Sequence, residues 1–387
     1  MSDTYHSTHN YLPDQYDQTS KMGTNHNYLT EQFSDYPKIF EKIASVVKDG
    51  DFTLGRAVDK FERRFAATVG ANHAIGVGSG TDALFLSLKA LGIKEGDEVL
   101  APTFTCYATI GAIVTAGATP VFVDSGFDYN IDVDQIESLI TPRTKAIVPV
   151  HWSGKPCDMD RIEAIAKKYN LFLVEDACHA ITASYKGRLA GTYGDAGCFS
   201  LHPLKNLNVW GDGGFIVTNN DDLAAKLRLM RNHGLSGRDT CEVFAYNSRL
   251  DTIQAVVGDH LMDKISQITK ARINNAAFLD KALEGVRGVS IPPRDRKDIR
   301  QVFHIYSLQF DHRDELKKTL MANGVDAKIH YPIPMHLQPA AAHLNYSAGD
   351  FPHAEFICES ILSLPVHEFI TQKQLQKMVD IIVEFYR

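Results

Sequence analysis

The sequence lacks the features that would assign it to several specialised classes of protein. Its 387 residues contain no apolar run long enough to span a membrane, and the N-terminus lacks the basic and then apolar order of a signal peptide. The net charge is −7, without the clustered lysine and arginine that nucleic-acid binding requires. We therefore expect neither a membrane span nor a nucleic-acid partner.

Cysteine is present but unpatterned. The six cysteines are scattered and form no Cys-x-x-Cys pair, so the spacing indicates neither a zinc site nor a disulfide framework. We accordingly expect no bound metal and a reducing, cytoplasmic location. The cysteines are residues 106, 157, 178, 198, 241 and 358.

The apolar residues follow an alternating order of strands and helices. With 44% hydrophobic and 22% charged residues, the composition is that of an ordinary globular protein. Short apolar runs alternate with helical patterns from residue 73 onward, which predicts βαβ units and an α/β fold with a mostly parallel sheet. Strands are expected at 74–77, 98–101, 119–123, 146–150 and 171–175, and helices at 82–91, 107–116 and 159–169.

The chain divides into three parts by composition and by the periodicity of its apolar residues. Residues 1–26 are polar and short of aliphatic side chains, which predicts a flexible tail. Residues 27–265 carry the βαβ pattern of a large domain. Residues 266–387 combine alternating strand patterns at 302–310 and 327–331 with helical ones, which predicts a smaller α+β domain.

A lysine in a polar turn is the first candidate for chemistry. Lys205 lies between an apolar run and a glycine cluster, in the segment CFSLHPLKNLNVWGDGGF that spans residues 198–215. A partly desolvated lysine amine can form a Schiff base with a carbonyl group. Most lysines beside turns are solvated surface charges, so Lys205 alone indicates little.

Two further positions point to a bound phosphate and a bound ring. The turn Gly76-Val-Gly-Ser-Gly-Thr81 opens a helix, and free amides at a helix N-terminus bind monophosphates, although such turns are also common as pure structure. Asp176 follows the strand at 171–175, at the edge where α/β sheets bind ligands. An ordinary helix N-cap is the alternative role for this aspartate.

These segments together resemble one family. The 198–215 segment, Asp176 before it, the Asn247-Ser-Arg-Leu-Asp251 segment and the loop HYPIPMHLQP at 330–339 occur in the order typical of the DegT/DnrJ/EryC1/StrS family of sugar aminotransferases. The resemblance extends from about residue 27 to the C-terminus. It implies a fold-type-I enzyme that depends on pyridoxal 5′-phosphate, and it reverses our preference for a capping role of Asp176.

The resemblance also implies a role for each matching residue. Lys205 would bind the cofactor covalently and act as catalytic base and acid. Asp176 would keep the pyridine nitrogen protonated, and His179 would hydrogen-bond the phenolic oxygen. The remaining implied contacts are Ser79, Gly80, Thr81, Ser200 and a partner subunit's Asn247 for the phosphate, and His330 and Tyr331 for the substrate.

One position departs from the family pattern. Cys106 stands where the family usually has an aromatic residue that stacks on the cofactor ring. Stacking is therefore weaker here, or Tyr107 or Phe104 substitutes for the missing aromatic side chain.

The implied function is transfer of an amino group from an amino acid, with L-glutamate expected, to a keto-sugar for surface polysaccharide or lipopolysaccharide. The acceptor would be an 8-keto-octulosonate or a nucleotide-linked keto-deoxyhexose, and a homodimer would share its active sites. Two alternatives stay open: a sugar dehydratase with the same cofactor, or a non-catalytic sugar-binding or regulatory protein. Lys205 favours transamination over dehydration, because dehydrating relatives have histidine at that position.

Overall fold

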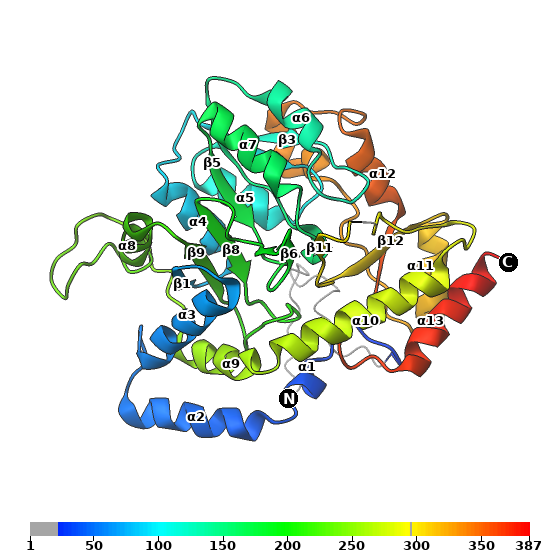
Figure 1. Cartoon of the computed structure of the whole chain (residues 1–387), viewed down its shortest axis with the longest axis horizontal. Coiled ribbons are helices and arrows are strands. Elements are labelled where there is room, and N and C mark those ends of the chain that lie inside the picture. Colours follow the sequence, from blue (N-terminus) through cyan, green and yellow to red (C-terminus); the bar gives the residue numbers. More distant parts are fainter. Residues whose placement is uncertain (1–21, 295) are drawn as a thin grey trace, which may run out of the picture.

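A seven-stranded sheet forms the centre of the larger part of the computed structural model, which describes residues 22–294 and 296–387 (Figure 1). Its strands lie in the order β1-β9-β8-β5-β4-β2-β3. Strand β9 runs antiparallel to both neighbours, and all other adjacent pairs are parallel. The prediction of an α/β fold with a mostly parallel sheet is confirmed. The strands are β1 (His73–Val77), β2 (Glu98–Pro102), β3 (Thr119–Val123), β4 (Thr144–Ile147), β5 (Phe172–Asp176), β8 (Ala196–Ser200) and β9 (Gly214–Thr218).

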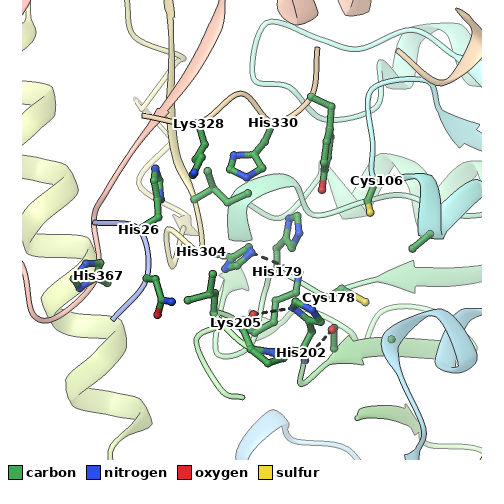
Figure 2. A pocket seen from close by; sticks show the side chains of 18 of the residues that line it. His26, Cys106, Cys178, His179, His202, Lys205, His304, Lys328, His330 and His367 are labelled. Carbon is green, nitrogen blue, oxygen red and sulfur yellow. Dashed lines mark hydrogen bonds between the residues drawn. The ribbon is translucent and has the colours of Figure 1, made fainter. Parts of the chain in front are cut away.

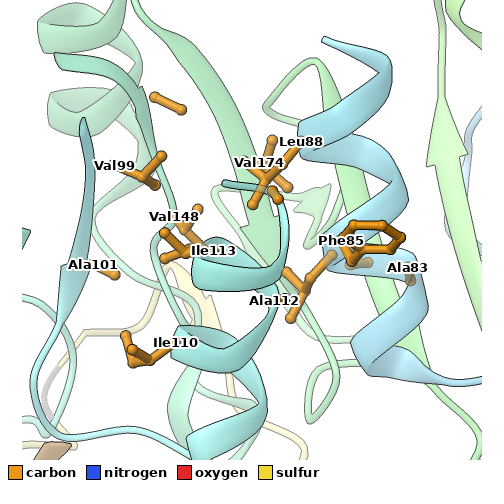
Figure 3. Close-up of a cluster of buried hydrophobic side chains, with 14 of the residues drawn as sticks. Ala83, Phe85, Leu88, Val99, Ala101, Ile110, Ala112, Ile113, Val148 and Val174 are labelled. Carbon is orange, nitrogen blue, oxygen red and sulfur yellow. The ribbon is translucent and has the colours of Figure 1, made fainter. Parts of the chain in front are cut away.

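Helices cover both faces of this sheet because each strand is apolar on both sides. Successive side chains of a strand point to opposite faces. In β8, Cys198 packs in the core beneath α4, α5 and α8, whereas Phe199 packs in a second core with α3 and α9. A third core, under α6 and α7, covers β2 to β5. Figure 3 shows the first of these cores, with Leu88 of α4 beside Val174 of β5.

Some helices of this part, such as α2 and α3, are amphipathic, whereas α4 and α9 are buried over most of their length, and several have recognisable ends. Ser79 caps α4 by accepting a hydrogen bond from the Asp82 amide, and Gly50 and Gly70 end α2 and α3 in the left-handed conformation. The helices are α1 (Leu29–Gln32), α2 (Tyr36–Asp49), α3 (Arg56–Val69), α4 (Gly80–Ala90), α5 (Tyr107–Thr115), α6 (Val133–Ile136), α7 (Met159–Tyr169), α8 (Asp221–Met230) and α9 (Thr252–Met262).

The C-terminal part has its own sheet and core. Helix α10 (Ile265–Leu283) leads from the larger part to the smaller one, where its apolar residues pack with β12, β13, α11 and α13 (Figure 1). The sheet order is β10-β12-β13, with all pairs antiparallel. The elements are β10 (Val289–Ser290), β12 (Tyr306–Phe310), α11 (Arg313–Ala322), α12 (Pro352–Ser360), β13 (Ile361–Leu364) and α13 (Gln372–Phe385).

Several local predictions differ from the structure. The expected strand at 327–331 forms only a single bridge, between Lys328 and Ser363, and the expected strand at 302–310 is confined to β12. In the segment before β12, His304 and Ile305 line the cavity described below, whereas Val302 and Phe303 pack in hydrophobic cores. A small sheet of β6 (Ser184–Tyr185), β7 (Arg188–Leu189) and β11 (Ile299–Arg300) was not predicted.

The first described residues lie along the smaller part. The Thr24 amide donates to the Gly324 carbonyl at 3.0 Å, and the Asp326 amide donates to the Thr24 carbonyl at 2.9 Å. Residues 22–26 belong to the segment for which we expect a flexible tail, and these backbone contacts hold them against the 324–326 segment. Residues 1–21 of that tail lie outside the described residues.

Candidate active site

A cavity of about 640 Å³ opens at the carboxyl ends of the central strands, between the larger and smaller parts (Figure 2). Such an edge is where open α/β sheets bind ligands. The cavity brings together nearly all of the predicted site residues. Those lining it are Ser79, Gly80, Thr81, Cys106, Asp176, His179, Ser200, Lys205, His330 and Tyr331.

Lys205 reaches the cavity from a turn that follows β8. Its amide donates to the His202 carbonyl at 3.1 Å, and Leu204 before it has a left-handed backbone, with φ of +74°. The Lys205 ammonium lies 3.5 Å from Nε2 of His304. Burial lowers the pKa of Lys205 from its ordinary value, against the opposing effect of Cys178, Cys106 and Asp176. A larger fraction of neutral amine results, which is the form that attacks a carbonyl group.

The N-terminus of α4 forms one end of the cavity. The amides of Gly80 and Thr81 belong to the first turn, where a helix has no internal acceptors for its N–H groups. A Cβ atom on Gly80 would lie 2.7 Å from Cβ of Ser200 and 2.9 Å from Sγ of Cys178. Glycine is therefore required at position 80, and this end can hold a phosphate group close to the backbone.

Asp176 and His179 lie further along the cavity. Oδ2 of Asp176 accepts a hydrogen bond from the Thr109 hydroxyl at 2.8 Å, and Oδ1 accepts one from the Cys178 amide at 3.2 Å. The His179 ring lies between Trp152 and His304, with ring centroids 5.5 and 4.5 Å away. Burial holds the pKa of His179 well below its ordinary value, so the imidazole is neutral near pH 7. Sequence reasoning missed Thr109, because a threonine within an apolar helix gives no periodic signal.

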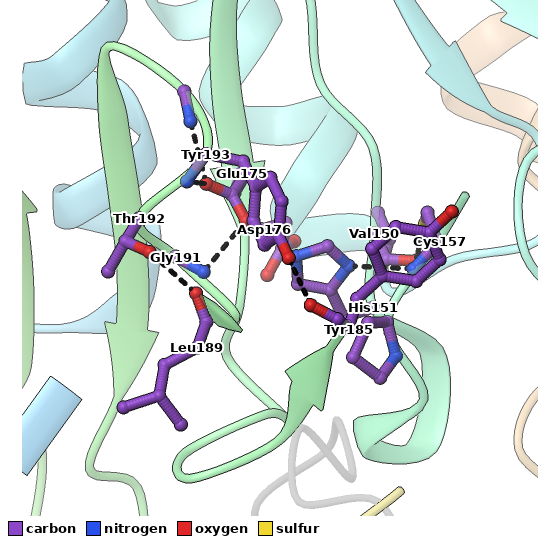
Figure 4. A network of polar contacts seen from close by, with 12 residues as sticks. Val150, His151, Cys157, Glu175, Asp176, Tyr185, Leu189, Gly191, Thr192 and Tyr193 are labelled. Atoms are coloured by element: carbon purple, nitrogen blue, oxygen red, sulfur yellow. Dashed lines mark hydrogen bonds and ion pairs between the residues drawn. The ribbon is translucent and has the colours of Figure 1, made fainter. Parts of the chain in front are cut away.

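A buried network fixes the strand end that carries Asp176 (Figure 4). The side chains of Glu175 and His151 are fully buried. Oε1 of Glu175 accepts from the amides of Tyr193 and Gly194 at 2.6 and 2.8 Å, and Oε2 accepts from the Gly191 amide at 2.7 Å.

His151 completes this network and joins it to Asp176. The Cys157 amide donates to Nδ1 of His151 at 3.2 Å, so the ring proton is on Nε2, which donates to Oε2 of Glu175 at 2.9 Å. The His151 amide also donates to the Asp176 carbonyl at 3.1 Å. The position of Asp176 is thus set from both backbone and side chain.

The aromatic position occupied by Cys106 has a neighbour at the cavity. Cys106 precedes α5 and lines the cavity, as does Tyr107, which is 60% exposed. Phe104 is buried against Trp152, with ring centroids 4.5 Å apart, and does not line the cavity. Of the two aromatic residues considered as substitutes, only Tyr107 is placed beside the site.

The smaller part lines one side of the cavity with histidine side chains and one lysine. Nδ1 of His330 lies 3.0 Å from the Ser363 hydroxyl, and the Lys328 ammonium lies 3.0 Å from Asp326. Figure 2 shows Lys328 between His26 and His330, on the side of the cavity away from Cys178. Burial lowers the pKa of His26 to about 4 and that of His330 to about 3, so both rings are neutral at pH 7. Neither Lys328 nor His26 was predicted to line the site.

Asn247 lies outside the cavity of its own chain. It is exposed and forms a backbone bridge with Asn232, whereas its neighbour Ser248 accepts a hydrogen bond from the Gly78 amide at 3.2 Å. Asn247 does not line this cavity, so any contact with a cofactor phosphate requires a second subunit.

This fold and this lysine site define the class of pyridoxal-phosphate-dependent aminotransferases. The model of the DegT/DnrJ/EryC1/StrS aminotransferase family matches residues 34–383, and the chain belongs to that family. It is similar to dTDP-3-amino-3,4,6-trideoxy-alpha-D-glucose transaminase of Streptomyces venezuelae, with 39% identity over 89% of this chain and 90% of the relative.

A second relative named as an aminotransferase and a solved structure with a ketimine intermediate agree on the class, whereas another relative is named as a regulatory protein. The UDP-N-acetyl-3-dehydro-alpha-D-glucosamine 3-aminotransferase of Acidithiobacillus ferrooxidans is 40% identical over 89% of this chain and 93% of its own. A "Pleiotropic regulatory protein" of Geobacillus stearothermophilus is 41% identical over 91% and 95%. The crystal structure of S. venezuelae DesV with a ketimine intermediate superposes with a TM-score of 0.90 at 37% identity, over 94% and 98%.

The cofactor of this enzyme is pyridoxal 5′-phosphate, as in its family. The cavity fits that group on three observations. Gly80 leaves the helix N-terminus open to a phosphate, Lys205 has a lowered pKa, and the buried Nδ1 of His179 has no hydrogen-bond partner among the described residues. An unpaired buried polar atom is costly, so a ligand atom opposite His179 would satisfy it.

Proposed function

We propose that the enzyme transfers the amino group of L-glutamate to a nucleotide-linked keto-sugar, for the synthesis of a surface polysaccharide. The observation that carries this proposal is Lys205, a partly buried lysine of lowered pKa in a cavity with a phosphate-binding end. Relatives named as transaminases of dTDP- and UDP-linked sugars support the class of acceptor over a free octulosonate.

Most of the predicted residues have a role in this proposal. Pyridoxal phosphate supplies an electron-withdrawing ring that stabilises negative charge on the substrate carbon. Lys205 would hold the cofactor, and its amine would move the proton at the α-carbon of the donor. Asp176 would pair with the ring nitrogen and His179 with the phenolic oxygen. The Ser79–Thr81 turn and Ser200 bind the phosphate.

We propose that Lys328 and the neighbouring His330 bind a carboxylate of the donor. Among the described residues lining the cavity, the cations are Lys205, Arg272 and Lys328. The guanidinium of Arg272 donates to Tyr28 and to the carbonyls of Phe303 and His304. Lys328 has one carboxylate neighbour, Asp326. An ammonium group has three hydrogen-bond donors, so Lys328 can also donate to an anionic group of the substrate.

We further propose a homodimer in the cytoplasm. The exposed Asn247, which lies outside its own cavity, supports a site completed by the partner subunit. The six cysteines are all free, which suits a reducing compartment. No helix in the described part of the chain has the length and apolar character needed to cross a bilayer.

The test combines spectroscopy with an isotope. Purified protein with pyridoxal phosphate should show a visible band that L-glutamate removes, and the Lys205→Ala variant should lack this band, whereas Lys94→Ala at an exposed lysine should keep it. With ¹⁵N-labelled glutamate and dTDP- or UDP-linked keto-sugars, the label should appear in the sugar.

Each alternative has a distinct outcome in the same test. A product without nitrogen and without a hydroxyl group would indicate a dehydratase. A wild-type protein without any visible band would leave a binding or regulatory role.

A further inference from the structure

The backbone on both sides of Lys205 is held by one short N-terminal segment, residues 28–32. This segment comprises Tyr28, the N-cap of α1, and the single turn of α1 itself. Tyr28 and Gln32 lie at the two ends of this segment. Each is only 3% exposed, although both side chains carry polar groups. Their polar groups are directed at the lysine turn.

Tyr28 holds the residue before the lysine. Its hydroxyl donates to the Leu204 carbonyl at 3.1 Å and accepts from the Arg272 guanidinium at 2.5 Å. Its ring stacks on His367, with centroids 4.4 Å apart. A left-handed backbone at a non-glycine residue such as Leu204 is strained and persists only where contacts impose it. The Tyr28 hydroxyl is such a contact.

Gln32 holds the lysine itself, through Asn208. Nδ2 of Asn208 donates to the Lys205 carbonyl at 2.9 Å and to Oε1 of Gln32 at 2.8 Å. Nε2 of Gln32 donates to Glu368 at 3.1 Å. Asn208 is fully buried, so its orientation is fixed by these partners.

Arg272 of α10 connects the contacts of Tyr28 with those of Gln32. Its Nε lies 3.5 Å from Glu368, and its other nitrogens donate to Tyr28 and to the carbonyl of His304, whose ring faces the Lys205 amine. Both peptide carbonyls around Lys205 and the ring opposite its amine therefore depend on one connected set of hydrogen bonds.

We propose that Tyr28 and Gln32 are positioning residues for Lys205, which set how the amine is presented to the cofactor. The proposal rests on the proposed role of Lys205 as the cofactor-binding lysine. It places the N-terminal segment, which precedes residues 34–383 that the family model matches, inside the working site.

The experiment uses three variants of the full chain. Tyr28→Phe removes the hydroxyl but keeps the stacking on His367. Gln32→Met removes the hydrogen bonds of Gln32 to Asn208 and Glu368. Tyr386→Phe is the matched control, because the Tyr386 hydroxyl also donates to a backbone carbonyl, that of Asp311, near the C-terminus (Figure 1). The probes are pyridoxal phosphate added to cofactor-free protein, the pH midpoint of the visible band, and amide hydrogen exchange.

We expect pyridoxal phosphate to react with Tyr28→Phe about fivefold more slowly than with wild type, the factor that corresponds to one hydrogen bond of about 1 kcal/mol. The pH midpoint of the band should also shift, and exchange should rise in peptides covering residues 202–208 alone. Gln32→Met should act in the same direction, and Tyr386→Phe should match the wild type.

Two results would overturn the proposal. One is wild-type behaviour of both variants in all three measurements. The other is faster exchange throughout the protein, because a general loss of stability has no bearing on positioning. A wild-type protein that forms no visible band would instead refute the role of Lys205, while exchange at 202–208 would still test the hold on the turn.

Discussion

Replacing Glu175 by glutamine tests how far the position of Asp176 depends on a buried charge. In the wild type, the four acceptor contacts of Glu175 are matched by three backbone amides and Nε2–H of His151. A glutamine can place its oxygen against the amides of Tyr193 and Gly194. Its NH₂ group then faces the Gly191 amide and the His151 ring, both of which are donors.

The cost follows from the donors left without acceptors. The His151 ring cannot shift its proton to Nδ1, because that atom accepts from the Cys157 amide. Each buried donor without a partner costs about 1–3 kcal/mol. Two such donors give about 4 kcal/mol, which is a large part of the about 5–15 kcal/mol by which proteins of this kind are stable. Folding of the variant no longer removes a carboxylate from water, and this gain offsets part of the cost. We therefore expect the free energy of unfolding to fall by about 3 kcal/mol.

The assay is urea unfolding of cofactor-free Glu175→Gln, followed by circular dichroism. Glu95→Gln, at an exposed glutamate, is the control and should stay within about 0.5 kcal/mol of wild type. We also expect weaker binding of pyridoxal phosphate to Glu175→Gln, because the strand end that carries Asp176 is loosened. A loss below about 1 kcal/mol would refute the hydrogen-bond assignment made for His151.

Three further predictions concern the substrate wall, the pH response and the second subunit. Lys328→Met should raise the KM for L-glutamate about tenfold at an unchanged limiting rate, from loss of one charge-assisted bond, and an unchanged KM would remove Lys328 from the donor site. Burial lowers the pKa of His367 from 6.5 to about 3. As the pH falls below 6.5, the unfolded state therefore binds a proton at His367 that the folded state does not, and the stability of the fold decreases. In urea titrations at several pH values, His367→Gln should reduce that slope by about 1.4 kcal/mol per pH unit, and an unchanged slope would contradict the assignment. Mixing inactive Lys205→Ala and Asn247→Asp chains should restore about a quarter of the wild-type activity if the sites are shared, and no recovery would refute a site shared between subunits.

The sequence was most informative where a residue is chemically distinctive and follows a strand. Lys205, Asp176 and the Ser79–Thr81 turn all follow strands in the sequence, and the structure brings them to one cavity, although their catalytic and binding roles stay predictions. The α/β fold itself was predictable from alternating periods, because each strand of the central sheet is buried on both faces.

The remaining site residues were not predictable from local pattern. Thr109, Lys328 and His26 come from a helix, a loop and the N-terminal segment, and only the folded chain brings them to one cavity. The tail boundary at residue 26 rested on polar composition, yet Thr24 and His26 make polar contacts with the smaller part. Composition cannot distinguish a polar segment that docks from one that stays solvated.

The edge-to-face contact of Trp152 with His179 gives the enzyme an internal optical probe. The protein has two tryptophans, Trp152 beside the cavity and Trp210 beneath α2, against Phe33 and Phe40. A cofactor that absorbs in the near ultraviolet will quench the emission of the nearer indole by energy transfer. Occupancy of the site can therefore be followed in the unlabelled protein, and a Trp210→Phe variant would leave Trp152 as the sole reporter.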